Sequence, residues 1–152
     1  MSEYERTIAI QAPPDRVFEF VADIRNMPRY MPTATRVEAQ GDSRVRVEGE
    51  AHGHHYVSDG WMRSDGSRRR LEWGADEGDY NGWLQVREDG PRSEVTIHLS
   101  MRRDQRRADR RGSLSDDEVM DGLMTSLQSI RNHLEGQASK VEPAAATSES
   151  AD

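Results

Sequence analysis

The spacing of apolar residues changes early in the chain. Residues 3–11 alternate apolar and polar side chains, which predicts a strand. Val17, Phe20, Val21 and Ile24 then recur at helical spacing, but a proline interrupts the pattern after barely two turns, and a second short piece ends at the next proline. Isolated helices this short are marginal in water. We therefore expect two short helices that are held by packing against the rest of the fold.

A period of two runs through the middle of the chain as far as Met101. Six stretches alternate apolar and polar residues, or nearly so, and turn signals separate them at intervals of roughly 8–12 residues. This arrangement is typical of an antiparallel meander. We predict six further strands, with turns near Gly41, Gly53, Gly66, Gly78 and Gly90.

The last periodic segment predicts a long helix. Ser115 and Glu118 have the spacing of a capping box, and the apolar residues that follow are three or four positions apart. Gly136 is expected to end this helix. Residues 137–152 contain almost no large apolar side chain, so we predict one domain over residues 3–136 and a disordered tail over 137–152.

Together these elements predict an α+β fold with a single six- to seven-stranded antiparallel sheet. One apolar face of such a sheet must be covered, and the C-terminal helix is the only predicted element with the length and the apolar stripe to do so. The two short helices after the first strand are expected to close one open end of the curled sheet.

Composition excludes several classes of protein. The chain has no cysteine, which excludes disulfides and thiolate metal sites and fits a reducing cytoplasm. No apolar run approaches the ~18 residues of a membrane helix, and the N-terminus lacks the pattern of a signal peptide. The net charge of −7 argues against general nucleic-acid binding. We expect a cytoplasmic domain without a transmembrane segment.

Three stretches of the chain carry a resemblance to a known family. They are IAIQAPPDRVFEFVADIRNMPRYMP near the start, LEWGADEGDYNGWLQV followed by SEVTIHL in the sheet, and the C-terminal helix. An aliphatic-x-Trp strand (Leu71, Trp73) and a Gly-x-aliphatic strand (Gly82, Leu84) belong to the same pattern. Over Glu3 to Gly136 the chain resembles the START-like (SRPBCC) superfamily, and within it the polyketide cyclase/dehydrase and lipid-transport group.

The resemblance implies the helix-grip fold, in which the sheet curls around the long helix and leaves an apolar cavity between them. Small residues at Gly49, Ala51, Ala75 and Gly82 share the inward parity, and they either leave room for a ligand or let the helix pack closely. A plainly packed core is the alternative. The superfamily includes carriers, cyclases, hydrolases and chaperone-associated domains, so the fold does not name an activity.

Residues on the inward strand positions and on one helix face are the candidates for ligand binding: Val47, Trp73, Leu84, Ile97, Leu99, Met120, Leu123, Met124 and Leu127. The methionines suit a site that accepts varied apolar ligands, or they fill gaps in an ordinary core. If the resemblance holds, Met27, Tyr30 and Met31 on the second short helix border an entrance.

The stretch HGHHY, residues 52–56, is the strongest candidate for polar chemistry. Alternation along a strand allows at most two of its histidines to converge, and Asp59 lies ~13 Å from His55 along the strand, too far for one metal ion. The sequence therefore predicts no metal site. One interpretation of this stretch is a polar cluster at the end of a strand. The other is that polar side chains line a pocket, namely those of His55, Tyr56 and Asp59.

No nucleophile elbow, phosphate-binding glycine loop or dinucleotide fingerprint occurs, so no cofactor is predicted and no catalytic residue is assigned. Arg102 to Arg111 contains three arginine pairs, where most members of the family have a short turn. It predicts either a solvated loop or a site for an anionic surface or an acidic partner.

We interpret the chain as a binding domain that carries or sequesters a small hydrophobic molecule, such as a lipid, an isoprenoid or an aromatic polyketide. The first alternative is an aromatase/cyclase or dehydratase that acts on such a molecule without metal or nucleotide. The second is an interaction domain that uses the arginine segment. A carrier needs only an apolar cavity, whereas an enzyme needs polar groups that converge on it.

Overall fold

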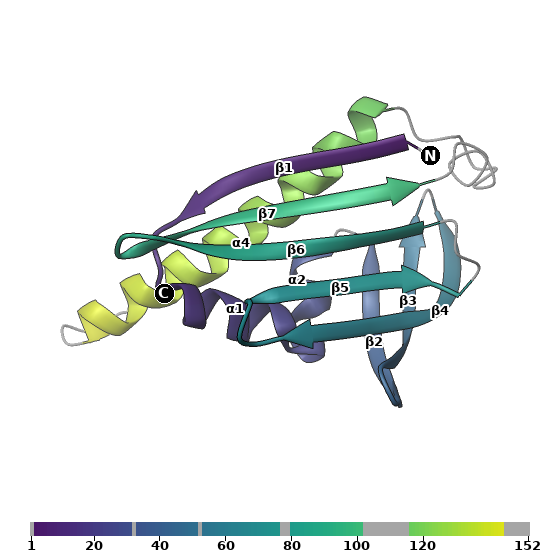
Figure 1. Ribbon diagram of the computed structural model, residues 1–152, viewed down its shortest axis with the longest axis horizontal. Coiled ribbons are helices and arrows are strands. Elements are labelled where there is room, and N and C mark those ends of the chain that lie inside the picture. The colour runs from purple at the N-terminus through teal and green to yellow at the C-terminus, as the bar shows by residue number, and fades with distance from the viewer. Residues whose placement is uncertain (1, 32, 52, 77–79, 102–115, 145–152) are drawn as a thin grey trace.

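The computed structural model describes residues 2–31, 33–51, 53–76, 80–101 and 116–144 (Figure 1). A strand is followed by three short helical segments, six more strands and one long helix. The elements are β1 (Ser2–Ile10), α1 (Pro14–Ala22), η1 (Ile24–Asn26), α2 (Met27–Tyr30), β2 (Ala34–Gly41), β3 (Arg44–Ala51), β4 (His54–Asp65), β5 (Arg70–Ala75), β6 (Tyr80–Asp89), β7 (Arg92–Met101) and α4 (Asp116–Ala144).

All seven strands form one antiparallel sheet in the order β1-β7-β6-β5-β4-β3-β2. Strands β2 to β7 follow one another as a meander, and β1 pairs with β7, the last strand of the chain. Strands β1 and β2 lie at opposite edges of the sheet, so a hairpin cannot join them, and the helical segments between them carry the chain from one edge to the other. The predicted α+β fold with six to seven antiparallel strands is confirmed.

Helix α4 crosses one face of the sheet and packs mainly against β1 (Figure 1). Leu127, Ile130 and Leu134 along this helix are fully or almost fully buried. They belong to the same core as Ile10 of β1 and Val95 of β7. At the other end of the helix, the Tyr4 hydroxyl donates to Asp116 Oδ1 at 2.9 Å, which ties β1 to the first turn.

Helix α4 does not end where the sequence pattern predicted. It runs through Gly136 to Ala144, so the expected stop at Gly136 is wrong. A glycine ends a helix by adopting a left-handed backbone, and Gly136 is not among the glycines with a positive φ angle. Within a helix, one glycine costs only about 1 kcal/mol relative to alanine. Ser115 of the predicted capping box and the tail residues 145–152 lie outside the described residues.

The short helices are held by tertiary contacts, as the sequence predicted. Val17 and Val21 on one face of α1 are completely buried. The Tyr30 hydroxyl of α2 donates to the Val21 carbonyl at 2.7 Å, and the Phe20 ring stacks on His133 of α4 at 4.3 Å between ring centroids. These contacts fasten α1 and α2 to each other and to α4, which stabilises segments that are too short to fold alone.

Candidate functional site

A cavity of about 640 Å³ lies between the first half of α4, helix α2 and the inner face of the sheet. This volume is within the range of ~300–1,000 Å³ that is typical of small-molecule sites. Thr33, Ser58, Glu118 and Asp121 line the cavity and are themselves exposed, so they mark its open side. The mouth therefore lies between the first turns of α4 and the strands on the β2 side of the sheet.

The walls of the cavity are mainly apolar. Strands β3, β5, β6 and β7 all contribute inward-facing side chains, and alternation along each strand places them on one face of the sheet. Of the candidates from the sequence, the structure places these around the cavity: Val47, Trp73, Leu84, Ile97, Leu99 and Leu123. Their role in binding a ligand remains a prediction.

The other three helix candidates do not line the cavity. Leu127 is 0% exposed and packs in the solid core beyond the cavity. Met120 and Met124 are partly exposed, because they lie around the helix from the line of Val119, Gly122 and Ser126 that faces the cavity. The apolar face of the helix that the sequence predicted is wider than the face that lines the cavity.

The three candidate entrance residues all line the cavity, but two of them are buried. Met27 is 1% and Tyr30 is 7% exposed, whereas Met31 is partly exposed. Burial raises the pKa of Tyr30, whose hydroxyl is already engaged by the Val21 carbonyl. Met27 and Tyr30 are thus wall residues, and the entrance role stays a prediction.

The three polar candidates on β4 divide between the two faces of the sheet. Tyr56 lines the cavity, and its hydroxyl lies 2.7 Å from Thr33 Oγ1. His55 and Asp59 are exposed and are not among the cavity-lining residues. Asp59 accepts from Arg46 Nε on β3 at 2.8 Å, and this hydrogen bond lowers the pKa of Asp59. Only Tyr56 of the three belongs to the pocket.

Tyr80 is a lining residue that the sequence interpretation missed. It begins β6 and lines the cavity, and burial raises the pKa of its hydroxyl. Tyr80 shares the parity of Gly82 and Leu84, both assigned to the inward face. That parity was the signal that could have found it.

Two small residues on the inward face permit close contacts. A Cβ at Gly49 would lie 2.6 Å from the Tyr56 hydroxyl, and a Cβ at Gly82 would lie 2.9 Å from Cζ2 of Trp73. Both glycines therefore let an aromatic side chain of the cavity wall lie flat across a strand. At these two glycines the neighbouring aromatic side chains, and not the long helix, make the close contacts.

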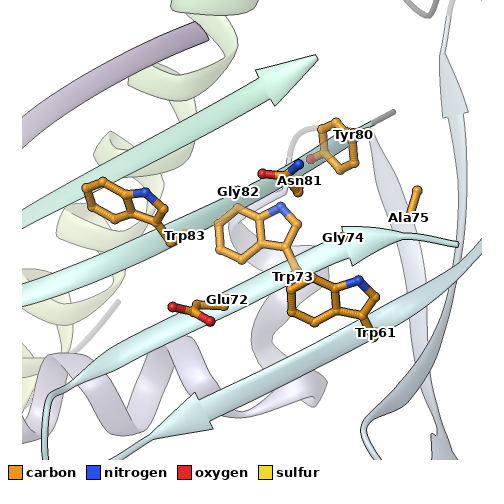
Figure 2. Close-up of a pocket in the computed structure, with 9 residues that line it drawn as sticks. All are labelled: Trp61, Glu72, Trp73, Gly74, Ala75, Tyr80, Asn81, Gly82 and Trp83. Atoms are coloured by element: carbon orange, nitrogen blue, oxygen red, sulfur yellow. The ribbon is translucent and has the colours of Figure 1, made fainter. Parts of the chain in front are cut away.

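A second, smaller hollow of about 380 Å³ adjoins the cavity (Figure 2). Glu72 and Trp83, which line it, alternate with the cavity-lining residues Trp73 of β5 and Leu84 of β6 and so face the opposite side of the sheet. Arg70 stacks over Trp83 at 4.4 Å from the ring centroid. The two hollows share five residues: Trp61, Trp73, Gly74, Ala75 and Tyr80. They meet at the ends of β5 and β6.

The described part of the chain contains no group of three His, Cys, Asp or Glu side chains that could hold a metal ion. No Arg, Lys or His is among the described residues that line the cavity. His52 and the segment Arg102 to Arg111 lie outside the described residues, so the partner predicted for the arginine segment stays a prediction.

Sheet, helices and cavity together define the helix-grip fold. The model of the family described as "Polyketide cyclase / dehydrase and lipid transport" matches residues 1–142. The chain belongs to this family. Among curated proteins, none is significantly similar to it in sequence.

Solved structures share the fold at low sequence identity. The di-domain ARO/CYC BexL from the BE-7585A biosynthetic pathway is 23% identical with a TM-score of 0.70, over 89% of this chain and 47% of BexL. This chain therefore spans about half the length of BexL. The Zhui aromatase/cyclase from Streptomyces sp. R1128 is 21% identical with a TM-score of 0.61, over 95% of this chain and 97% of Zhui.

A START superfamily protein from Mycobacterium smegmatis is 14% identical with a TM-score of 0.67, over 91% of this chain and 98% of its own. At these identities the likeness concerns the fold. Across the residues that the structure describes, no helix has both the length and the apolar character needed to cross a membrane.

Proposed function

We propose that this protein binds one small, mainly apolar molecule in the cavity and carries or sequesters it. The observation that carries the proposal is a cavity of about 640 Å³ whose walls are mostly aliphatic and aromatic. Apolar surface of a ligand gains free energy on leaving water, at ~25 cal/mol per Å² buried. A lipid, an isoprenoid or an aromatic polyketide has the required character, and membership of the family supports this class. We expect the protein to act in the cytoplasm.

Binding accounts for the cavity better than catalysis does. General acid–base chemistry needs a group that exchanges a proton near neutral pH, most often a histidine or a carboxyl group. Among the described lining residues the carboxyl groups are those of Glu118 and Asp121, both on the exposed rim. Burial raises the pKa of Tyr80 and so disfavours its use as a base.

An aromatase/cyclase or dehydratase is the second candidate. Two tyrosine hydroxyls, of Tyr56 and Tyr80, lie in the cavity wall and provide the convergent polar groups that an enzyme needs. The descriptions of BexL and Zhui as cyclases point in the same direction for those proteins. For this chain we propose ligand binding. Conversion of the bound molecule to a product would distinguish the enzyme from the carrier.

Native mass spectrometry of the purified protein tests the proposal. We expect a non-covalent adduct of one small molecule per chain, which organic extraction releases and which rebinds to the emptied protein. The same molecule recovered unchanged after incubation supports carriage, and its conversion to a product supports the enzyme. If no adduct forms and apolar fluorophores do not bind to the emptied protein, the ligand-binding proposal is wrong.

A further inference from the structure

Ser126 of α4 is a buried polar residue whose hydroxyl has no hydrogen-bond partner among the residues that the structure describes. Besides the tyrosines, three described polar residues are buried: Ser93, Thr96 and Ser126. The Ser93 hydroxyl donates to the Ala12 carbonyl at 2.7 Å, and Thr96 Oγ1 lies 2.8 Å from Thr7 Oγ1. No hydrogen bond joins the Ser126 side chain to a described residue. Buried polar groups are almost always paired, so this exception calls for an explanation.

Ser126 faces the cavity at its inner end. Val119, Gly122 and Ser126 lie on one line of the helix, and all three line the cavity. Ser126 lies ~12 Å along the helix axis from Glu118 on the exposed rim, at ~1.5 Å per residue. Of the described α4 residues it is the last that lines the cavity, and Leu127 after it packs in the core. Ser126 is 8% exposed and therefore lies away from the open side.

The described residues around Ser126 do not satisfy its hydroxyl. In a helix, a serine hydroxyl can bond to the carbonyl four residues earlier, here that of Gly122, but Ser126 does not make this bond. In the protein without ligand, a water molecule can pair with the hydroxyl, and a ligand that fills the cavity displaces this water. The ligand must then supply a partner itself. Otherwise the hydroxyl stays unpaired beside the buried Leu123 and Leu127, which is unfavourable.

We infer that the ligand carries a hydroxyl or a carbonyl group at the end that enters the cavity first, and that this group pairs with Ser126 Oγ. A serine hydroxyl donates or accepts, so it suits either group. The inference rests on the proposed function and narrows the ligand class to apolar molecules with a polar atom at their inner end. It also fixes the direction of binding, because an amphiphile whose single polar group stays at the mouth would leave Ser126 unpaired.

Two probes of nearly equal shape test the inference: 2-naphthol, which has a hydroxyl group, and 2-methylnaphthalene, which has a methyl group in its place. The affinity of each probe is compared between the emptied wild type and emptied Ser126→Ala, so that the difference in hydration between the probes cancels. We expect Ser126→Ala to bind 2-naphthol about threefold to tenfold more weakly, which is the effect of one neutral hydrogen bond. It should bind 2-methylnaphthalene at least as tightly as the wild type does, which also reports that the cavity is intact.

Ser58→Ala is the matched control, because Ser58 also lines the cavity but lies on its exposed rim. This variant should bind both probes as the wild type does. The melting temperature of the emptied proteins gives a second readout. Ser126→Ala removes an unpaired hydroxyl and introduces the best helix former, so it should melt at or above the wild-type temperature. A clearly lower melting temperature would mean that the fold itself satisfies the hydroxyl, which would overturn the inference.

The outcomes separate the two proposals. If neither probe binds to the wild type, the proposed function fails, and the inference fails with it. An unchanged affinity of Ser126→Ala for 2-naphthol, or an equal loss of affinity for both probes, overturns the inference and leaves the binding cavity standing.

Discussion

Tyr30 shows how much the short helices depend on a single buried hydroxyl. Its buried hydrogen bond to the Val21 carbonyl joins α2 to α1. Tyr30→Phe keeps the ring and leaves the carbonyl without this donor, so the free energy of unfolding should fall by about 1–3 kcal/mol. Urea denaturation followed by circular dichroism measures this change.

Tyr56→Phe provides the comparison, because the Tyr56 hydroxyl pairs with the exposed Thr33 side chain, which water can satisfy in its place. We expect this variant to lose less than about 1 kcal/mol. A loss as large as that of Tyr30→Phe would show that the Thr33–Tyr56 contact is also part of the buried structure.

At the scale of single residues, the sequence predicted strand positions better than helix positions. A strand has two faces, so alternation alone assigned Trp73, Leu84 and Ile97 to the inward side. Around a helix, each residue turns by about 100°, and the stripe did not show which part of it would meet the cavity. Met124 was misplaced for this reason. Tyr56 could not be assigned to a face until the register of β3 and β4 was known.

At the scale of elements, α4 divides into two functional parts. Its first turns line the cavity, and the turns from Leu127 onward pack in the core through Leu127, Ile130 and Leu134. Leu127→Ala should therefore lower the free energy of unfolding by about 2–5 kcal/mol, because it leaves a hole in close-packed surroundings. It should leave the affinity for an apolar probe unchanged, since Leu127 does not touch the cavity.

Met124→Ala is the control on the same helix. Met124 is partly exposed and lies outside both the core and the cavity, so its loss should cost less than about 1 kcal/mol. Chemical denaturation of the two variants side by side measures the difference. Equal costs at the two positions would contradict the division of α4 into a part that lines the cavity and a part that packs in the core.

The order and type of the elements could be predicted from the sequence, but the end of α4 could not. Periods of two and of three to four residues identified the strands, the short helices and the long helix. Glycine often ends a helix, because its backbone can adopt the left-handed conformation. It need not do so, and the residue type of Gly136 alone therefore could not show where the helix ends. The cavity itself depends on the curl of the sheet, for which a single sequence carries no direct signal.

At the scale of the whole molecule, residues 3–136 should fold without the rest. Leu134 is the last buried residue of α4 whose side chain is described, and Glu135 accepts from the Gln11 backbone N–H at 2.9 Å. A chain that ends at Gly136 keeps the buried Leu134 side chain and the hydrogen bond to Glu135. Its melting temperature should match that of the full chain to within about 2 °C, as differential scanning calorimetry can measure. A loss of several degrees would mean that residues 137–152 pack on the domain.

The central claim is that the space between α4 and the sheet is a binding site. Gly122 is the best position for a test, because it lines the cavity and a Cβ built there meets nothing within 4 Å. In Gly122→Phe the ring should enter the open space and bury apolar surface. The substitution also removes a glycine from inside the helix, where glycine is unfavourable, so both effects should stabilise the folded protein. Gly136→Phe makes the same exchange at an exposed position of the same helix.

The most direct measurement is therefore the affinity of an apolar fluorescent probe for the wild type, Gly122→Phe and Gly136→Phe, with the melting temperature of each protein. We expect Gly122→Phe to melt at or above the wild-type temperature and to bind the probe at least about tenfold more weakly, which corresponds to the loss of ~1.4 kcal/mol of binding free energy. Gly136→Phe should bind as the wild type does. Wild-type affinity in a stably folded Gly122→Phe would contradict the claim that this cavity is the binding site.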